Sequence, residues 1–74
     1  MKRTKVINCV KEYRVEVGLT QKELAKEVNV SRQTIIAMEN QDYVPSVLVA
    51  MCICRVLDKP VEKVFDCKGV KVKK

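Results

Sequence analysis

The sequence lacks histidine and tryptophan altogether, and its 74 residues include only two glycines, two prolines and one phenylalanine. Without histidine, neither imidazole acid–base catalysis nor a histidine-bound metal is available. The remaining acids and nucleophiles show no spacing beyond a helical pattern, so the sequence argues against an enzyme. A chain of this length forms one small domain with a modest core.

Long hydrophobic runs are also missing. The longest, Val47 to Cys54, falls far short of the ~20 residues that a membrane helix needs. The charged start Met1-Lys2-Arg3 is not followed by the apolar stretch of a signal peptide. We therefore expect a cytoplasmic protein with reduced thiols and no membrane contact.

Four cysteines are present: Cys9, Cys52, Cys54 and Cys67. On one helix, the thiols of Cys52 and Cys54 would point ~200° apart, which does not suit a shared metal ion. We interpret Cys9 and Cys54 as small apolar residues. Cys67 is a candidate for pairing across a dimer, although a reducing cytosol opposes this. We expect no metal, no cofactor and no small-molecule ligand.

The charge balance is strongly basic. Lys and Arg total fifteen against nine Asp and Glu, which gives a formal net charge of +6. Such a surplus favours a polyanionic partner, above all nucleic acid. Charge alone leaves an alternative, a small basic protein with no particular partner.

Hydrophobic spacing predicts a first helix over residues 5–17, where Val6, Val10, Tyr13 and Val17 recur at steps of three and four. Gly18 fits the position just after a helix, where a left-handed backbone is usual.

Capping signals mark the next two helices. Thr20 followed by Glu23 is a capping box and predicts a short helix that ends near Val28. Ser31 is a good N-cap for a further helix that ends near Asn40.

Only Asn29 and Val30 separate these two helices, so the helices must cross steeply. Ala25 provides the small residue that close crossing needs, and Asn29 tolerates a left-handed turn. The apolar seam between the helices consists of Leu24, Val28, Val30, Ile35 and Met38. The pattern is that of a helix-turn-helix over residues 20–40.

Pro45 and Ser46 start a fourth, strongly apolar helix, and residues 61–65 form a last short one. We therefore expect a helix-turn-helix DNA-binding domain over residues 1–66. Residues 67–74 form a basic C-terminal tail, either a short strand or a flexible segment.

Five segments in order resemble the helix-turn-helix domains of Xre-type regulators, which share a fold with the phage Cro and lambda-type repressors. The segments are GLTQKELA, VSRQTI, MEN, the YxPS of Tyr43 to Ser46, and VEKVF, and the resemblance covers roughly residues 5–66. It implies an all-α fold, a compact five-helix domain of the lambda-repressor-like type. It also implies that the protein binds double-stranded operator DNA as a homodimer.

In this type of domain, the second helix of the motif lies in the major groove and presents its first side chains to the base edges. Arg32 can bridge guanine O6 and N7, and Gln33 can bridge adenine N6 and N7. Ser31 is also predicted to contact bases, and Ile36 to meet a thymine methyl or a sugar. The alternatives are a solvated first turn and a merely exposed isoleucine. The charge of Arg32 opposes the helix dipole, which favours the functional interpretation.

The resemblance assigns backbone-phosphate contacts to Gln21 and Asn40, with Thr34 suited to a phosphate or to local packing. The alternatives are a neutral first-turn residue at Gln21 and a helix cap at Asn40. The resemblance also pairs Arg14 with Glu39, as a structural ion pair at the base of the recognition helix. The alternative there is two unrelated surface charges.

The sequence departs from the family pattern after the recognition helix. Gln41 stands where relatives commonly have glycine. A left-handed glutamine costs on the order of 1 kcal/mol, so we expect the turn to differ.

The fourth helix is the largest departure. The resemblance places its core at Val47, Ala50, Ile53, Cys54 and Leu57. Leu48 and Cys52 fall where relatives have charged residues, and we predict that they form a two-fold dimer contact. The alternatives are a modest exposed patch, or the tail folding back over them with Val70 and Val72 inward.

The leading hypothesis is a sequence-specific transcriptional regulator, a repressor that reads a pseudo-palindromic operator as a homodimer. The alternative is a protein-interaction module, such as an antitoxin that holds a partner protein and autoregulates its operon. Co-purification of an unrelated chain would favour that alternative.

Overall fold

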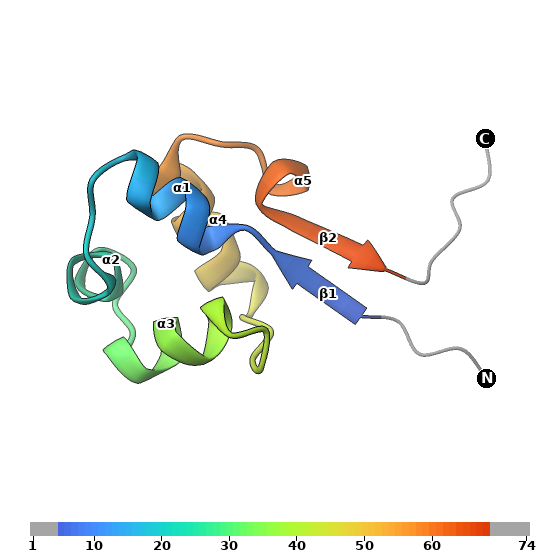
Figure 1. The fold of residues 1–74 in the computed structure, drawn as a ribbon, viewed down its shortest axis with the longest axis horizontal. Helices are drawn as coiled ribbons and strands as arrows, with labels where there is room; N and C mark the ends of the chain where they lie inside the picture. The colour runs from blue at the N-terminus through green and yellow to red at the C-terminus, as the bar shows by residue number, and fades with distance from the viewer. Residues whose placement is uncertain (1–4, 69–74) are drawn as a thin grey trace.

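The structure is a computed structural model that describes residues 5–68 as five helices and a two-stranded sheet (Figure 1). In chain order the elements are β1 (Lys5–Asn8), α1 (Val10–Glu16), α2 (Gln21–Glu27), α3 (Arg32–Glu39), α4 (Val47–Leu57), α5 (Val61–Val64) and β2 (Phe65–Lys68). The helices pack together, and the sheet extends away from them on one side. The predicted helical fold class is confirmed.

The first predicted helix is wrong at its beginning, because residues 5–8 form a strand. β1 pairs with β2 in antiparallel register, with Asn8 opposite Phe65. The spacing of Val6 and Val10 fits a helix, but a strand from the far end of the chain offers β1 its hydrogen bonds, and β-branched residues suit a strand. α1 therefore begins only at Val10.

At the other end, β2 continues across the expected domain boundary at residue 66 and carries the paired backbone to Lys68. The remaining tail residues, 69–74, lie outside the described part of the chain, and with them the predicted inward positions of Val70 and Val72.

Side-chain caps start α2, α3 and α4 where the sequence predicts. Thr20 Oγ1 accepts a hydrogen bond from the Glu23 backbone N–H at 3.0 Å, and Glu23 Oε1 accepts one from the Thr20 N–H at 2.8 Å. The hydrogen bond from the Thr20 backbone is the main cause that lowers the pKa of Glu23 from its ordinary value. Ser31 Oγ and Ser46 Oγ each accept from the backbone N–H three residues on, both at 3.2 Å. The predicted capping box and the Ser31 cap are confirmed.

A residue with a left-handed backbone conformation lies on each side of α3. Asn29, in the turn before it, has φ 59°, as expected for so short a connection. Asn40 is the C-cap, and Gln41 follows with φ 67°. The expectation that glutamine would change this turn is wrong, because the backbone adopts the left-handed geometry despite the side chain.

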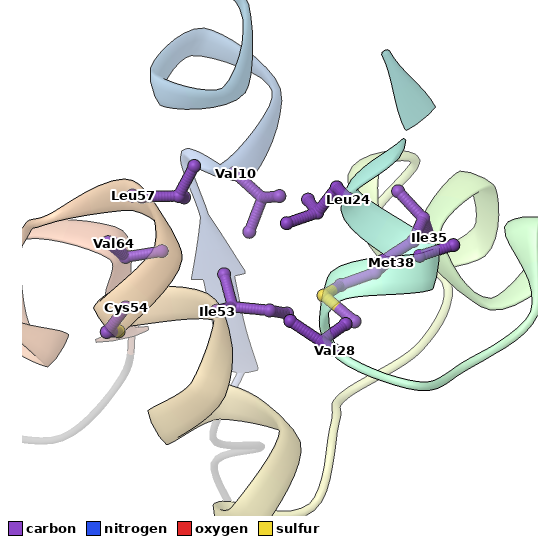
Figure 2. Close-up of a cluster of buried hydrophobic side chains, with 10 residues drawn as sticks. Val10, Leu24, Val28, Ile35, Met38, Ile53, Cys54, Leu57 and Val64 are labelled. Atoms are coloured by element: carbon purple, nitrogen blue, oxygen red, sulfur yellow. The ribbon is translucent and has the colours of Figure 1, made fainter. Parts of the chain in front are cut away.

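One cluster of buried side chains joins all five helices, and Figure 2 shows these side chains pointing toward one another. The cluster consists of Val10, Leu24, Ala25, Val28, Ile35, Met38, Ile53, Cys54, Leu57 and Val64. Ala25 is buried between α2 and its neighbours, as close crossing requires. The predicted seam is buried except for Val30, which packs against the cluster and stays half-buried.

Val47, which the resemblance places in the core, and Cys9, interpreted as a small apolar residue, are both exposed. Val47 is 77% exposed because it is the first residue of α4, directly after the Ser46 cap and beyond the edge of the core. Cys9 is exposed in the link between β1 and α1, where it occupies the N-cap position. Of the other predicted core positions on α4, Ala50 is half-buried.

Candidate nucleic-acid interface

α3 lies along the lower edge of the molecule in Figure 1, with one side in the core. Ile35 and Met38 are fully buried, which turns the opposite side of the helix outward. At about 100° per residue, the outward side is centred on Gln33 and on Asn40, two turns later. Both residues are exposed. This side is the surface of α3 that a second molecule meets first.

Ile36 and Ala37 flank that outward line, and both are half-buried. Ile36 therefore remains accessible beside Gln33, on the side where the sequence predicts it. Ala37 was not among the predicted contact residues. The signal that identifies it is its spacing of four from Gln33, on a helix whose buried stripe is already known.

Arg32 lies on the side of α3 that faces the start of α2. Together with Thr20, Gln21 and Lys22 it lines an open cleft there. Arg32 and Lys22 are exposed cations, and the first N–H groups of α2 add a partial positive charge. The cleft therefore attracts anions. Lys22 was missed by the sequence analysis, although it carries the same signal as Arg32, a cation placed against a helix dipole.

Ser31 and Thr34 interact with each other within the first turn of α3. Their hydroxyl oxygens lie 2.9 Å apart, in addition to the capping bond from the Thr34 backbone N–H to Ser31 Oγ. Ser31, predicted to contact bases, is thus engaged in capping the helix. Thr34 is half-buried beside it, as the local-packing alternative describes.

Arg14 and Glu39 form an ion pair between α1 and α3. Arg14 Nε donates to Glu39 Oε2 at 2.7 Å, and Arg14 Nη2 donates to Oε1 at 3.3 Å. Arg14 Nη1 also donates to the carbonyl oxygen of Leu19 at 2.8 Å. The Glu39 side chain is only 3% exposed and that of Arg14 11%. Each charge therefore depends on the other, because neither has water to replace its partner.

Gln21 joins the same carboxylate from α2. Its Nε2 donates to Glu39 Oε1 at 3.1 Å, so side chains of three helices meet at Glu39. One N–H and the carbonyl oxygen of the Gln21 amide remain for another partner. Gln21 is half-buried and lines the electropositive cleft. Gln21 is thus available for the phosphate contact that the resemblance assigns to it, and its bond to Glu39 is an additional contact with no signal in the sequence.

The outer side of α4 carries exposed apolar side chains, which we call the α4 patch. It consists of Val47, Leu48 and Met51 on α4, exposed by 77, 71 and 56%, and of Val44 in the loop before the helix, exposed by 59%. Cys52, predicted to accompany Leu48 at a dimer contact, turns partly inward and packs against the core. The structure thus brings Leu48 together with different neighbours from those predicted.

Among residues 5–68, no group of three Cys, Asp or Glu side chains is arranged to hold a metal ion. None of the described helices is long and apolar enough to cross a membrane. The thiols of Cys9, Cys52 and Cys54 are free. Burial, with a smaller effect from the charge of Glu62, raises the pKa of the Cys54 thiol.

Comparison with known proteins gives consistent matches. Residues 10–64 match the helix-turn-helix family. The HTH-type transcriptional regulator YgzD of Bacillus subtilis is 47% identical over 58 residues, which cover 78% of this chain and 88% of that protein. An HTH-type transcriptional regulator of Methanothermobacter thermautotrophicus is 49% identical over 57 residues, 76% of this chain and 83% of that protein.

Solved structures are similar as well. The N-terminal DNA-binding domain of SinR from Bacillus subtilis superposes with a TM-score of 0.66 at 30% identity, over 72% of this chain and 78% of that one. The restriction-modification controller protein C.AhdI from Aeromonas hydrophila gives a TM-score of 0.67 at 22% identity, over 73% of this chain and 82% of that one. The second likeness concerns the fold alone.

Proposed function

The chain belongs to the helix-turn-helix family of DNA-binding transcriptional regulators, and we propose that it is a repressor that reads a pseudo-palindromic operator as a homodimer. The family consists of regulators rather than enzymes. The proposed function places its action in the cytoplasm, where the operator DNA lies.

The observation that supports this proposal is that α3 is anchored on one side and exposes polar side chains on the other. Its inner side is fixed by Ile35 and Met38 in the core, while Arg32 and Gln33 stay exposed at its N-terminal end. A helix held in this way can enter the major groove with its first residues at the base edges. Arg32 then pairs with a guanine and Gln33 with an adenine, each pair contributing about 1–3 kcal/mol of discrimination.

Apolar groups supplement these polar contacts. In the same docking mode, Ile36 lies beside Gln33 and meets a thymine methyl. Ser31 contributes to specificity mainly through the helix that it caps, since its hydroxyl is already engaged with Thr34. Gln33 therefore carries the central contact, and Arg32 and Ile36, one turn apart, lie together on one side of it.

Phosphates are the proposed partners of the electropositive cleft. Gln21 keeps one free amide N–H after its bond to Glu39, and it lies at the positive end of α2. Lys22 lines the same cleft and supplies a charge that Gln21 lacks. Thr34 and Asn40 are the proposed phosphate contacts at the two ends of α3. These contacts orient the domain on the duplex but carry no sequence information.

A second copy is the proposed partner of the α4 patch. Three large exposed apolar side chains on one face of α4, with exposed Val44 in the loop before it, are typical of a protein–protein contact. A two-fold contact buries the same patch on both copies and spaces two recognition helices for two half-sites. Leu48 lies in this interface, and Cys52 lies at its inner border, where it is half-buried.

Selection of bound duplexes from random DNA tests the proposal. The wild-type chain is expected to enrich a palindrome with half-sites ~34 Å apart, one turn of DNA. Arg32→Ala and Gln33→Ala are expected to lose about 1–3 kcal/mol each at one base pair and to alter the enriched motif there. Lys63→Ala on α5 is the matched control, since it removes an exposed cation from the other side of the molecule.

The two outcomes separate clearly. A motif that changes with Arg32→Ala and Gln33→Ala but not with Lys63→Ala supports the assigned surface. If low-salt selection enriches no motif, or if all three variants act alike, α3 does not read bases. The experiment must be run at one stated salt concentration, because phosphate contacts make affinity strongly salt-dependent.

The α4 patch also favours a second candidate function, an antitoxin-like module whose patch holds a different protein. The two functions differ in the behaviour of the purified chain. A concentration-dependent dimer in light scattering supports the repressor. A monomer at every concentration, together with a stoichiometric complex with an unrelated chain, supports the module.

A further inference from the structure

The side-chain amide of Gln41 pairs with the backbone of Asn8 in the way that a neighbouring strand would. Its Oε1 accepts a hydrogen bond from the Asn8 backbone N–H at 3.0 Å, and its Nε2 donates to the Asn8 backbone carbonyl, also at 3.0 Å. The two residues are 33 positions apart in the chain. One side-chain amide thus satisfies both backbone groups of a single β1 residue.

The side chain of Asn8 completes the arrangement in the opposite direction. Its Nδ2 donates at 2.8 Å to the carbonyl of Met38 in the last turn of α3, which also accepts from the Gln41 backbone N–H at 3.0 Å. The same Nδ2 lies 3.3 Å from Gln41 Oε1, and Asn8 Oδ1 accepts from the Val10 backbone N–H at 3.1 Å. Asn8 is 8% exposed, and its bonds to Met38 and Val10 are buried, while Gln41 is exposed and its bonds to Asn8 are part-buried. We call the whole set the Asn8–Gln41 clasp.

The register of the sheet explains why Asn8 is available. In an antiparallel pair, adjacent residues point their backbone groups alternately toward and away from the partner strand. The Cys9 backbone N–H donates to the carbonyl of Val64 at 2.8 Å, on the β2 side. The N–H and carbonyl of Asn8 therefore face the other edge of β1, where Gln41 meets them. The clasp covers an edge that would otherwise expose unpaired groups.

We propose that Gln41 is a positioning residue, which holds the last turn of α3 and the adjacent Asn40 in place for contact with DNA. This inference rests on the proposed function. Glu39, the last residue of α3, ties the C-terminal end of the helix to α1 and α2. The clasp ties that end to β1 and to the start of α1. Asn40 lies between the tied residues Met38 and Gln41, so its amide is presented from a fixed turn.

The choice of glutamine over glycine follows from the same geometry. Gln41 has φ 67°, a region where glycine is unstrained and glutamine is not. Glycine would relieve the strain but could form none of the clasp bonds to Asn8. Gln41→Gly therefore loses the clasp bonds but also loses the backbone strain. Its unfolding midpoint is expected to stay close to that of the wild type. The variant can therefore show the effect of positioning Asn40 without a large change in the stability of the fold.

The first arm of the test needs no DNA. Amide hydrogen exchange by NMR is expected to show the Asn8 N–H protected in the wild type, because this N–H donates to Gln41 Oε1. In Gln41→Gly the protection is lost, and the Asp42 N–H, which donates to Ala37 at the end of α3, exchanges faster. Unchanged protection at both amides would overturn the clasp.

The second arm measures binding to the duplex that wild type enriches from random DNA. Gln41→Gly is expected to weaken binding by about three- to tenfold, the range for a small number of net hydrogen bonds. If Gln41 acts through Asn40, Asn40→Ala costs less in the Gln41→Gly background than in the wild type. Arg32→Ala, at the opposite end of α3, is the control and should cost the same in both backgrounds.

The outcomes distinguish the inference from the proposed function. Wild-type affinity in Gln41→Gly, or fully multiplicative effects of Gln41→Gly and Asn40→Ala, overturns the positioning role. If wild type enriches no duplex, the proposed function fails and the positioning role fails with it. The exchange arm then still decides whether the clasp holds α3.

Discussion

α3 and α4 are built alike on the inside and differently on the outside. Each begins at a serine whose Oγ accepts a backbone N–H at 3.2 Å, and each buries one side in the same core. The outer side of α3 presents polar groups around Gln33, and the helix is tied to its neighbours by Glu39 and the Asn8–Gln41 clasp. The outer side of α4 is the apolar α4 patch. α3 is therefore held in place by contacts within its own chain. The apolar surface of α4, in contrast, would be stabilised if a second molecule covered it.

This difference matches the two partners proposed. DNA has a rigid shape and fixed hydrogen-bonding groups, so a helix that reads it must be held in place before contact. A second protein copy offers apolar surface, and burying one Val, Leu or Met side chain contributes about 1.5–3 kcal/mol. Predictions that remove one property at a time can therefore show whether the two helices really serve different partners.

The largest expected effect comes from removing the ion pair that holds α3 in place. Glu39→Ala leaves the Arg14 guanidinium buried without its counter-charge and removes the partner of Gln21. We expect the free energy of unfolding to fall by about 3–5 kcal/mol, as for other broken buried pairs. Urea unfolding followed by circular dichroism measures the loss.

Glu27→Ala, which removes an exposed carboxylate at the end of α2, is the matched control. It is expected to change stability by at most about 0.5 kcal/mol. Equal losses from Glu39→Ala and Glu27→Ala would show that the ion pair does not hold α3. Partial recovery in the charge-reversed double variant Arg14→Glu, Glu39→Arg would show direct coupling.

The next effect concerns the outer side of α4. Leu48→Asp places a charge in the centre of the α4 patch and is expected to weaken the proposed dimer at least about tenfold, the equivalent of 1.4 kcal/mol. Stability of the monomer should hardly change, because Leu48 is 71% exposed within its own chain. Sedimentation over a range of concentrations measures the dimer.

Val15→Asp provides the comparison, because Val15 is an exposed apolar residue on α1 and lies outside the α4 patch. The dimer should tolerate it. A dimer that survives Leu48→Asp but not Val15→Asp would move the interface from α4 to α1, and the contrast between α3 and α4 would lose its functional meaning.

A smaller effect compares the two caps directly. Ser31→Ala and Ser46→Ala each remove one capping bond and should each cost about 1 kcal/mol of stability. Ser31 also bonds the Thr34 hydroxyl, so its loss should be the larger by a few tenths. Only Ser31→Ala is expected to weaken DNA binding as well, measured on the selected duplex. If both variants weaken DNA binding equally, cap loss acts through global stability rather than through α3.

The same contrast explains what the sequence could predict. α3 was well predicted because its signals are local: a serine cap, a left-handed asparagine before it and a buried stripe of Ile35 and Met38. The core assignment of Val47 failed because burial at a helix end depends on where the core stops, which no local pattern states. β1 was missed for a related reason, since its partner strand is far away in the sequence.

The candidate site shows the same limits. The pairing of Arg14 with Glu39 came from a resemblance, and the spacing of the two residues alone does not predict it. The bond from Gln21 to Glu39 and the clasp between Asn8 and Gln41 depend on rotamers and on long-range packing. The strained backbone of Gln41 was visible in the sequence as a misplaced glutamine, but its reason appears only beside β1.

The smallest effect uses the thiols to compare the inner side of α4 with an exposed link. Cys54 lies in the core, and burial raises the pKa of its thiol. A smaller fraction of Cys54 is therefore the reactive thiolate at a given pH. Cys9 is exposed, and Cys52 is half-buried. Alkylation by iodoacetamide, mapped by mass spectrometry in the native protein, should therefore be fastest at Cys9 and slowest at Cys54.

Denaturation in urea provides the control for that order, because the thiols then lose the differences that folding imposes. Raising the pH should continue to accelerate alkylation of Cys54 at values where an ordinary thiol is already deprotonated, because burial raises the pKa of Cys54. Leu48→Asp adds the comparison with the dimer. If a second copy covers the α4 patch, the variant exposes the border residue Cys52 and speeds its alkylation, while the rate at Cys54 stays the same. Equal acceleration at both cysteines would mean that the variant loosens α4 itself, and an unchanged rate at Cys52 would mean that no partner covers that side of the helix.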